Sequence, residues 1–357
     1  MKTANKRIVA LDVLRGLTVA MMILVNNTGH YFTQLSHVEW NGMTMCDMVF
    51  PFFLFVMGVS TYLSLSKAGF ERNGANWWHI CRRTVLIILV CWCICWLDNA
   101  VYGDFFPFGH LRLTGVLVRI ALSYGILSAL ALCVSHKSMP WIAGGLLALY
   151  AALLLLGNGY AADETSILYK VDVAVLGKSH LYAWAPVDPE GLLGLVPSVA
   201  HAILGFICGG MLASADDIRR RMTNMAGYAV FMLCIGMGLT AVLPLNKMIW
   251  SPSFVLVTCG SAQLLLAALM YIIDYKGIDG WTGVLRVFGT NSLLAYVLSE
   301  VLAVVLGRFG VLGWWHGLMD AVIPSKAFAD LACGLSMVAV CYAVCFILYR
   351  KKIIVKL

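Results

Sequence analysis

Ten long uncharged stretches run along the chain, separated by charged or Gly/Pro-rich breaks. Each stretch holds about 20 mostly apolar residues, which is the length a helix needs to cross a hydrocarbon core roughly 30 Å thick. The sequence therefore predicts an all-α, polytopic membrane helix bundle with about ten transmembrane helices. The expected spans are 9–32, 46–66, 84–102, 113–134, 139–157, 194–213, 226–243, 254–273, 284–305 and 331–349.

The connections between these stretches are short, except for three that fall on the same side of the expected bundle. They cover residues 33–45, 158–193 and 306–330. The chain carries no repeat of solenoid length and no obvious inverted repeat, so we expect a single transmembrane domain over residues 1–357.

Composition agrees with a membrane location, because 61% of the 357 residues are hydrophobic and only 12% are charged. The net charge of +7 is distributed unevenly. If both termini are cytoplasmic, 17 of the 25 Lys and Arg residues lie in cytoplasmic segments and only six in outer ones. The positive-inside rule therefore predicts an N-in, C-in orientation, and the positive charge does not indicate nucleic-acid binding.

Twelve cysteines are present, and most of them fall inside the apolar stretches. In that setting cysteine behaves as a small core hydrophobe. No pair of CxxC motifs occurs, so we expect no structural metal site.

Ionisable residues inside a membrane segment are costly, and each one is a candidate for function. Asp12 and Arg15 lie three residues apart at the start of the first span, where one helical face holds both. Two interpretations stay open: the pair is a structural anchor, or Arg15 faces a cavity and helps to hold an anionic ligand.

Arg119 in the fourth span has no acidic neighbour at helical spacing, so its partner must come from another helix or from a ligand. Asp47 and Glu300 are the candidates. The span 284–305 is unusually polar, because it carries Asn291, Ser292, Ser299 and Glu300, and we expect this helix to line an interior cavity.

His37 lies in the first outer connection, ten residues before Asp47 at the start of the second span. If the connection folds back over the bundle, the two side chains form a pair. A carboxylate orients an imidazole and helps it to accept a proton from an incoming amine or hydroxyl. His30 and His180 compete for this role.

A series of blocks along nearly the whole chain resembles the catalytic domain of the heparan-α-glucosaminide N-acetyltransferase family, known from lysosomes and from bacterial homologues. They are Leu11-Asp12-Val13-Leu14-Arg15-Gly16, Val25-Asn26, His37-Val38-Glu39-Trp40-Asn41-Gly42, Asp47-Met48-Val49-Phe50-Pro51-Phe52, Gly115-Val116-Leu117-Val118-Arg119, Asp188-Pro189-Glu190-Gly191, Asn246-Lys247-Met248-Ile249-Trp250-Ser251, Asn291-Ser292 and Tyr349-Arg350-Lys351-Lys352.

The resemblance implies that His37 is the catalytic residue and that Asp47 holds its ring. It also implies that Asn26 lies close to an acyl thioester. More distant membrane acyltransferases with a similar Leu-Arg opening carry a catalytic histidine eleven residues after the arginine, where this chain has Asn26. The remaining candidate residues for acyl-CoA or substrate binding are Arg15, Trp40, Asn41, Arg119, Asp188, Glu190, Trp250, Asn291, Ser292 and Glu300.

The resemblance further implies that acetyl-CoA enters from the cytoplasm and that its acetyl group is transferred to an extracytoplasmic amino sugar. The pantetheine arm is expected to thread the bundle, with Asn26 or Asn291 donating a hydrogen bond to the oxyanion. Cytoplasmic basic residues such as Arg82 and Arg83 are candidates for the phosphates. The family also suggests a homodimer, and we expect an inner bacterial membrane with its lipid as the surroundings.

In the connection 158–193, Trp184, Asp188 and Glu190 suit an amino sugar, although the segment from Asp188 to Gly191 could equally be a plain turn. Two other functions remain open. One is O-acylation of a glycan hydroxyl, and the other is proton-coupled transport, against which stands the lack of internal repeat symmetry.

Overall fold

The computed structural model of the protein describes residues 8–29, 31–183, 185, 187–214 and 217–355, and this part of the chain is helical without strands. Nine helices in it are long and apolar enough to cross a membrane. They are α1 (Val9–Asn26), α2 (Met45–Lys67), α3 (Gly74–Ala100), α4 (Val116–Cys133), α5 (Met139–Leu156) with the 3-10 turn η3 (His136–Ser138), α7 (Leu195–Ala213), α8 (Ile218–Leu239), α9 (Pro252–Leu269) with the π-helical turn η5 (Met270–Tyr275), and α13 (Lys326–Arg350).

The tenth predicted span is a bent pair, α10 (Gly283–Thr290) and α11 (Ser292–Arg308), whose axes differ by 84°. The count of ten spans is confirmed if the pair is taken as one span, but the expectation of a continuous helix over 284–305 is wrong. The break lies at Asn291, whose amide donates to the Ile353 carbonyl and whose oxygen accepts from the Val355 N–H. At the break, the Asn291 side chain is therefore bonded to the segment after α13.

Two of the long connections contain helices that the hydrophobic pattern did not predict. They are α6 (Ile167–Leu176) in 158–193 and α12 (Val311–Val322) in 306–330. The Ser166 side chain caps the start of α6, and Gly177 follows its end with a positive φ of 82°, which favours glycine. Three short 3-10 turns complete the described elements: η1 (Thr33–Leu35), η2 (Pro107–Gly109) and η4 (Lys178–His180).

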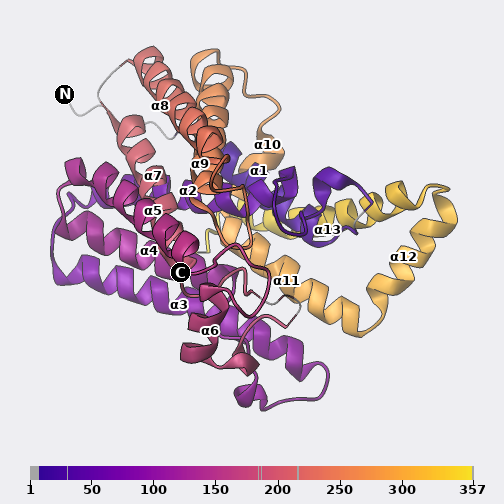
Figure 1. Ribbon diagram of the computed structural model, residues 1–357. Coiled ribbons are helices and arrows are strands. Elements are labelled where there is room, and N and C mark those ends of the chain that lie inside the picture. Colours follow the sequence, from indigo (N-terminus) through magenta and orange to yellow (C-terminus); the bar gives the residue numbers. More distant parts are fainter. Residues whose placement is uncertain (1–7, 30, 184, 186, 215–216, 356–357) are drawn as a thin grey trace.

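Helices α1 and α2 pass through the middle of the bundle, with α2 packed mainly on α7 and α1 on α10 (Figure 1). Glycines allow both close approaches. A Cβ added at Gly58 of α2 would overlap the carbonyl oxygen of Ala202 on α7, and one added at Gly289 of α10 would overlap that of Asp12 on α1. Small residues at helix contacts are typical of membrane bundles, where close backbone packing drives association.

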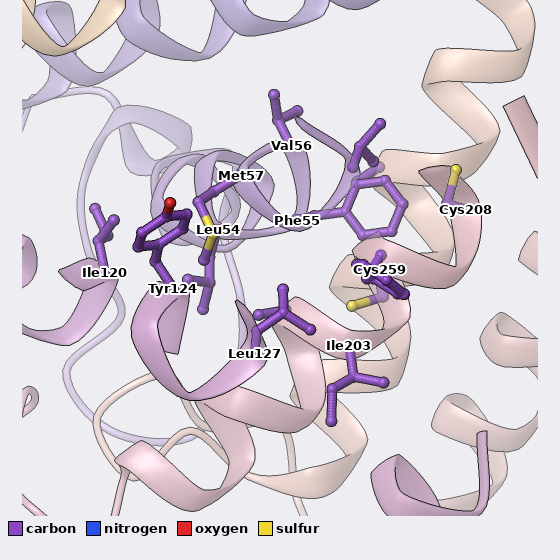
Figure 2. Packing of buried hydrophobic residues seen from close by; sticks show 14 of the residues in the cluster. Leu54, Phe55, Val56, Met57, Ile120, Tyr124, Leu127, Ile203, Cys208 and Cys259 are labelled. Atoms are coloured by element: carbon purple, nitrogen blue, oxygen red, sulfur yellow. The ribbon is translucent and has the colours of Figure 1, made fainter. Parts of the chain in front are cut away.

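The largest hydrophobic core lies between these central helices and α4 and α9. Figure 2 shows Phe55 of α2, Leu127 of α4 and Ile203 of α7 meeting there, with Cys208 and Cys259 beside them. All twelve cysteines are free, and seven are buried, so the predicted role as core hydrophobes is confirmed for those seven.

Helices α11, α12 and α13 project from one side of the bundle as a triangle (Figure 1). α12 joins the other two and contacts both, while α11 and α13 also contact α1. No residue of α12 is buried, so this helix lies at the periphery of the fold.

Candidate functional site

His37 and Asp47 lie in contact, as the expected folding back of the connection 33–45 requires. Nδ1 of His37 is 2.7 Å from Oδ1 of Asp47. Within the connection the Thr44 hydroxyl donates to the Ser36 carbonyl, and the Gly42 N–H attaches the connection to the Leu245 carbonyl.

The start of α2 explains why Asp47 is so well fixed. Thr44 and Asp47 form a capping box, in which the Thr44 side chain accepts the Asp47 N–H and the Asp47 carboxylate accepts the Thr44 N–H at 3.1 Å. Asp47 is 1% exposed, whereas the His37 side chain is 49% exposed. When Nδ1 donates to this carboxylate, Nε2 carries the lone pair that can accept a proton, and Nζ of Lys247 lies 3.2 Å from this atom.

Two further side chains contact the His37 ring, and neither was predicted to belong to the site. Nζ of Lys247 lies 2.9 Å from Nδ1 of His37, and Sγ of Cys46 lies 3.2 Å from the same atom. In the sequence Lys247 counted only as an outer-side charge. The sequence did offer one indication that Lys247 belongs to the site, because it lies in the block from Asn246 to Ser251, which resembles a block of the acetyltransferase family.

The exposed face of His37 opens into a cavity of about 390 Å³, which we name the histidine cavity. Part of its wall is apolar, formed by Met22, Val25 and Phe50. The polar part of its lining comprises Asn26, Glu39, Tyr182, Glu190, Lys247 and Tyr296. A space of this size, with few polar groups gathered near one imidazole, is typical of a small-molecule site.

Asn26 and Glu300 meet at the edge of this cavity. Nδ2 of Asn26 donates to Oε1 of Glu300 over 3.0 Å, and this bond joins the last residue of α1 to the middle of α11. Both residues were candidates from the sequence, and the structure brings them together. They lie near His37, because Asn26 and His37 line the same cavity.

The loop that carries Glu190 is anchored by Arg112, a residue that was not predicted to take part. Nη2 of Arg112 donates to Asp188 at 2.8 Å and to Glu190 at 2.7 Å. The Thr114 hydroxyl donates to the second oxygen of Asp188. Burial alone would raise the pKa of Asp188, but the Arg112 charge and these donors hold that pKa below its ordinary value.

Asp188 and Glu190 therefore have different surroundings. The Asp188 side chain is completely buried, and the Gly191 N–H donates to the Asp188 carbonyl, so for Asp188 the geometry favours the turn over direct sugar binding. Glu190 lines the histidine cavity.

The expected partners of Arg119 were wrong. Asp47 contacts His37 and Lys247, Glu300 contacts Asn26, and within the described residues neither carboxylate forms an ion pair with Arg119. Arg119 is buried, donates to the Gly191 carbonyl at 3.2 Å and lies 5.2 Å from the centre of the Trp250 ring. Nη2 of Arg119 thus contacts the turn after Glu190, while its Nε and Nη1 are buried without a hydrogen-bond partner among the described residues.

Trp40, Asn41 and Trp250 contact protein and do not line the cavity. Nε1 of Trp40 donates to the Tyr160 carbonyl, and Oδ1 of Asn41 accepts from the Asn246 amide. Trp250 is buried behind Arg119. The Asn41–Asn246 bond ties the His37 connection to the segment that carries Lys247, and the Trp40 bond ties it to Tyr160.

A second cavity, of about 510 Å³, lies at the opposite ends of α1 and α2. We name it the basic cavity, because Arg15, Lys67 and Arg83 line it. Arg15 also lies 3.3 Å from Asp12 and donates to the Ser60 hydroxyl at 2.6 Å. Both interpretations of Arg15 are therefore compatible with the structure, since it forms the pair and faces a cavity.

Asn291 and Ser292 line the basic cavity. Asn291 is not among the residues of the histidine cavity, and its side chain is bonded to Ile353 and Val355. The predicted role of Asn291 at an oxyanion beside His37 is therefore wrong. Asn26 is the asparagine that lies at the histidine cavity.

The two cavities approach each other along the helices but share no lining residue. On α2, Phe50 lines the histidine cavity and Phe53 the basic cavity. On α4, Val116 lines the first and Ile120 the second. About one helical turn, roughly 5 Å, separates the residues in each case. The expected continuous passage is thus two chambers with a thin apolar wall between them.

Two of the predicted residues, His30 and Trp184, lie outside the described residues. The His180 ring is engaged, because Nδ1 donates to the Leu111 carbonyl at 2.8 Å, and it does not line the histidine cavity. Across the described ranges, no group of three or more His, Cys, Asp or Glu side chains is arranged to hold a metal ion.

Comparison with known proteins extends these observations. A family model described as heparan-alpha-glucosaminide N-acetyltransferase, catalytic, matches residues 7–238. The heparan-alpha-glucosaminide N-acetyltransferase of Homo sapiens is 28% identical over 417 positions, covering 98% of this chain and 60% of that protein. The enzyme of the same name from Mus musculus is 27% identical, covering 84% of this chain and 54% of that protein. The chain thus spans less than two thirds of the length of either relative.

Proposed function

Because this chain belongs to the heparan-alpha-glucosaminide N-acetyltransferase catalytic family, we propose that it is a membrane acetyltransferase that transfers acetyl from acetyl-CoA to the amine of an amino sugar. The single observation that carries the proposal is the His37–Asp47 pair, set at the mouth of a cavity, where Nε2 of the ring can accept a proton once an acceptor amine takes the place of Lys247 Nζ, 3.2 Å away. A base oriented in this way is what amine acylation needs.

The basic cavity is the donor site in this proposal. Three cations, Arg15, Lys67 and Arg83, line one chamber and suit the phosphates of coenzyme A. Phe53, Val56 and Met57 continue the lining and suit the less polar pantetheine arm. The arm then has to pass the thin wall near Phe50 and Phe53 to bring its thioester to Asn26 and His37, so we propose that this wall opens when the donor binds.

The chemistry follows from the atoms around His37. As the acceptor nitrogen attacks the thioester carbonyl carbon, Nε2 of His37 takes a proton from that nitrogen and Asp47 stabilises the charged ring. The C–S bond then breaks, the amide forms, and the proton passes from His37 to the departing thiolate. Asn26 and Lys247 are near enough to stabilise the oxyanion.

The donor side of the bundle is cytoplasmic in this proposal. Segments that the charge distribution assigns to the cytoplasm line the basic cavity, while His37, Glu190 and Lys247 come from segments assigned to the other side. Acetyl transfer would therefore cross the membrane.

The test uses the purified full chain with acetyl-CoA and glucosamine, and it measures thiol release together with N-acetylglucosamine. Wild-type protein should produce both in equal amounts. His37→Ala should lower the rate by roughly 10²- to 10⁴-fold, which is the usual contribution of a general base.

His110→Ala is a matched control. His110 also forms an exposed pair with an aspartate, Asp104 at 2.9 Å, but it does not line the histidine cavity. If both alanine variants lose activity equally, or if His37→Ala retains the wild-type rate, the assignment of the base is wrong. Transfer only to hydroxyl acceptors would favour O-acylation, and uptake into vesicles without thiol release would favour transport.

A further inference from the structure

A third cavity lies at the same end of the bundle as His37, between the end of α1 and the triangle of α11, α12 and α13. Its volume is about 590 Å³, larger than that of the histidine cavity. Trp314 and Trp315 line it, and we name it the tryptophan cavity. Its long wall is apolar, formed by residues such as Leu306, Leu312 and Val340.

Asn26 lines both the tryptophan cavity and the histidine cavity. Helix α11 also runs from one cavity to the other, over two turns. Tyr296 lines the histidine cavity, Glu300 four residues later accepts the hydrogen bond from Asn26, and Ala303 three residues after that lines the tryptophan cavity. Residues at these spacings lie on one face of a helix, so the Asn26–Glu300 bond is the partition between the two cavities.

The polar end of the tryptophan cavity lies at this partition. Asn27 and Asp330 line it there, and Asp330 accepts the Gly29 N–H on both oxygens at 2.8 and 2.7 Å. Of the described residues that line the cavity, His316 is the one basic side chain, and none is a lysine or arginine. With Glu300 and Asp330 near its polar end, the cavity suits an amine or ammonium group and disfavours phosphates.

The outer face of the triangle is hydrophobic. Trp314 is 65% exposed, and the large side chains of Phe309, Val322 and Phe328 around α12 are also exposed. In a membrane protein such a surface faces lipid, and tryptophan prefers the boundary between the hydrocarbon core and the headgroups. A Cβ added at Gly313 or Gly317 of α12 would meet no atom within 4 Å, so this helix is loosely covered.

We propose that the tryptophan cavity holds the alkyl chain of a membrane-anchored acceptor, an amphiphile whose head is an amino sugar, and that the amine reaches His37 past Asn26. This inference rests on the proposed acetyltransferase function. A free sugar would lose hydrogen bonds to water against the apolar wall, whereas an alkyl chain that already lies among lipid tails enters the cavity without such a loss. The carboxylates at the partition complement the charge of the amine.

The experiment compares two acceptors in lipid nanodiscs, free glucosamine and dodecyl 2-amino-2-deoxyglucoside. We expect the wild-type KM to be at least about tenfold lower for the dodecyl acceptor, because its chain leaves water for the bilayer and the cavity, and Val340→Trp isolates the share that belongs to the cavity. Val340→Trp fills the cavity and should raise this KM by about tenfold while leaving the KM for glucosamine unchanged. Val344→Trp, one turn along α13 and outside the cavity lining, is the matched control and should change neither.

The inference would be overturned if Val340→Trp changed the KM for both acceptors equally, or if the dodecyl acceptor had no lower KM than glucosamine. In either case, acetylation of glucosamine would still support the proposed function. A binding measurement separates the two further. A dodecyl glucosaminide with a diazirine in its chain should label α12 or α13, and unlabelled dodecyl glucosaminide should compete. Labelling elsewhere, or undiminished labelling of Val340→Trp, would contradict the site even if no acetyl transfer were observed.

Discussion

Nζ of Lys247 lies 2.9 Å from Nδ1 of His37 and 3.5 Å from Oδ1 of Asp47, so these three side chains form one cluster at the mouth of the histidine cavity. They come from three separate segments. The catalytic pair predicted from the sequence is therefore better described as a cation, an imidazole and a carboxylate in mutual contact.

Removing the cation from this cluster should slow the reaction more than it weakens binding. Lys247→Met keeps most of the side-chain volume but takes away a charge that can stabilise the thioester oxyanion. We expect kcat to fall by about 10²-fold with a small change in KM, because such donors act mainly in the transition state. Steady-state kinetics with acetyl-CoA and glucosamine measure this. A rise in KM at unchanged kcat would instead assign Lys247 to ground-state binding.

Two neighbouring arginines at the start of α3 separate donor binding from general surface charge. Arg83 lines the basic cavity, whereas Arg82 does not, and both are exposed. Arg83→Gln should raise the KM for acetyl-CoA about tenfold through the loss of a charge-assisted contact to phosphate. Arg82→Gln should leave it unchanged. An equal rise in the KM for acetyl-CoA in both variants would mean that only the overall positive potential of this surface matters.

The Arg112 link should be essential for the loop 158–193. Arg112→Met leaves the buried Asp188 carboxylate without its cation, and breaking a buried ion pair in this way costs about 3–5 kcal/mol. Thermal unfolding in detergent and protease cleavage within 158–193 would report the loss. Lys178→Met removes an exposed pair with Glu164 in the same loop and should be indistinguishable from wild type.

Stability should depend on pH through Asp172 in α6. Burial raises the pKa of Asp172 to about 6, above its ordinary value of 3.8, although the Leu192 N–H opposes the shift. Between these two values the folded protein holds a proton that the unfolded chain has released. Asp172 therefore makes the free energy of unfolding fall as pH rises from about 4 to 6, by about 3 kcal/mol in total.

Asp172→Asn keeps an oxygen for the Leu192 N–H and cannot ionise. Its melting temperature should be flatter across this pH range and higher than that of the wild type at pH 7. A variant that is less stable than the wild type at pH 7 would show that the carboxylate is favourable when charged.

Much of the membrane architecture could be predicted from the sequence, because apolar length sets where a helix can cross a bilayer. The break at Asn291 was not predicted, because the side-chain bonds that Asn291 makes there join it to residues 353–355 far along the chain, and Gly289 two residues earlier was not taken as a break. Helix α12 was also missed. With 12 residues it is too short to cross a membrane. Its run of apolar residues is also shorter than the runs that marked the predicted spans.

The site was predicted where chemistry is local and missed where it is not. His37 and Asp47 are ten residues apart, and the capping box that fixes Asp47 is visible in the sequence as Thr44 and Asp47. Lys247 reaches His37 over 210 residues, and no periodicity encodes such a contact. The partner of Arg119 was misjudged because an acidic side chain was expected. Its actual contacts are a backbone carbonyl and an aromatic ring, which carry no charge that a sequence could reveal.

The bond between Asn291 and the tail after α13 has a consequence for how the protein is made. Ile354 and Val355 line the basic cavity together with Arg15 near the other end of the chain. This chamber cannot be complete until residue 355 has left the ribosome and the early helices are already inserted. We therefore expect nascent chains arrested before α13 to insert normally in the membrane but to retain no coenzyme A.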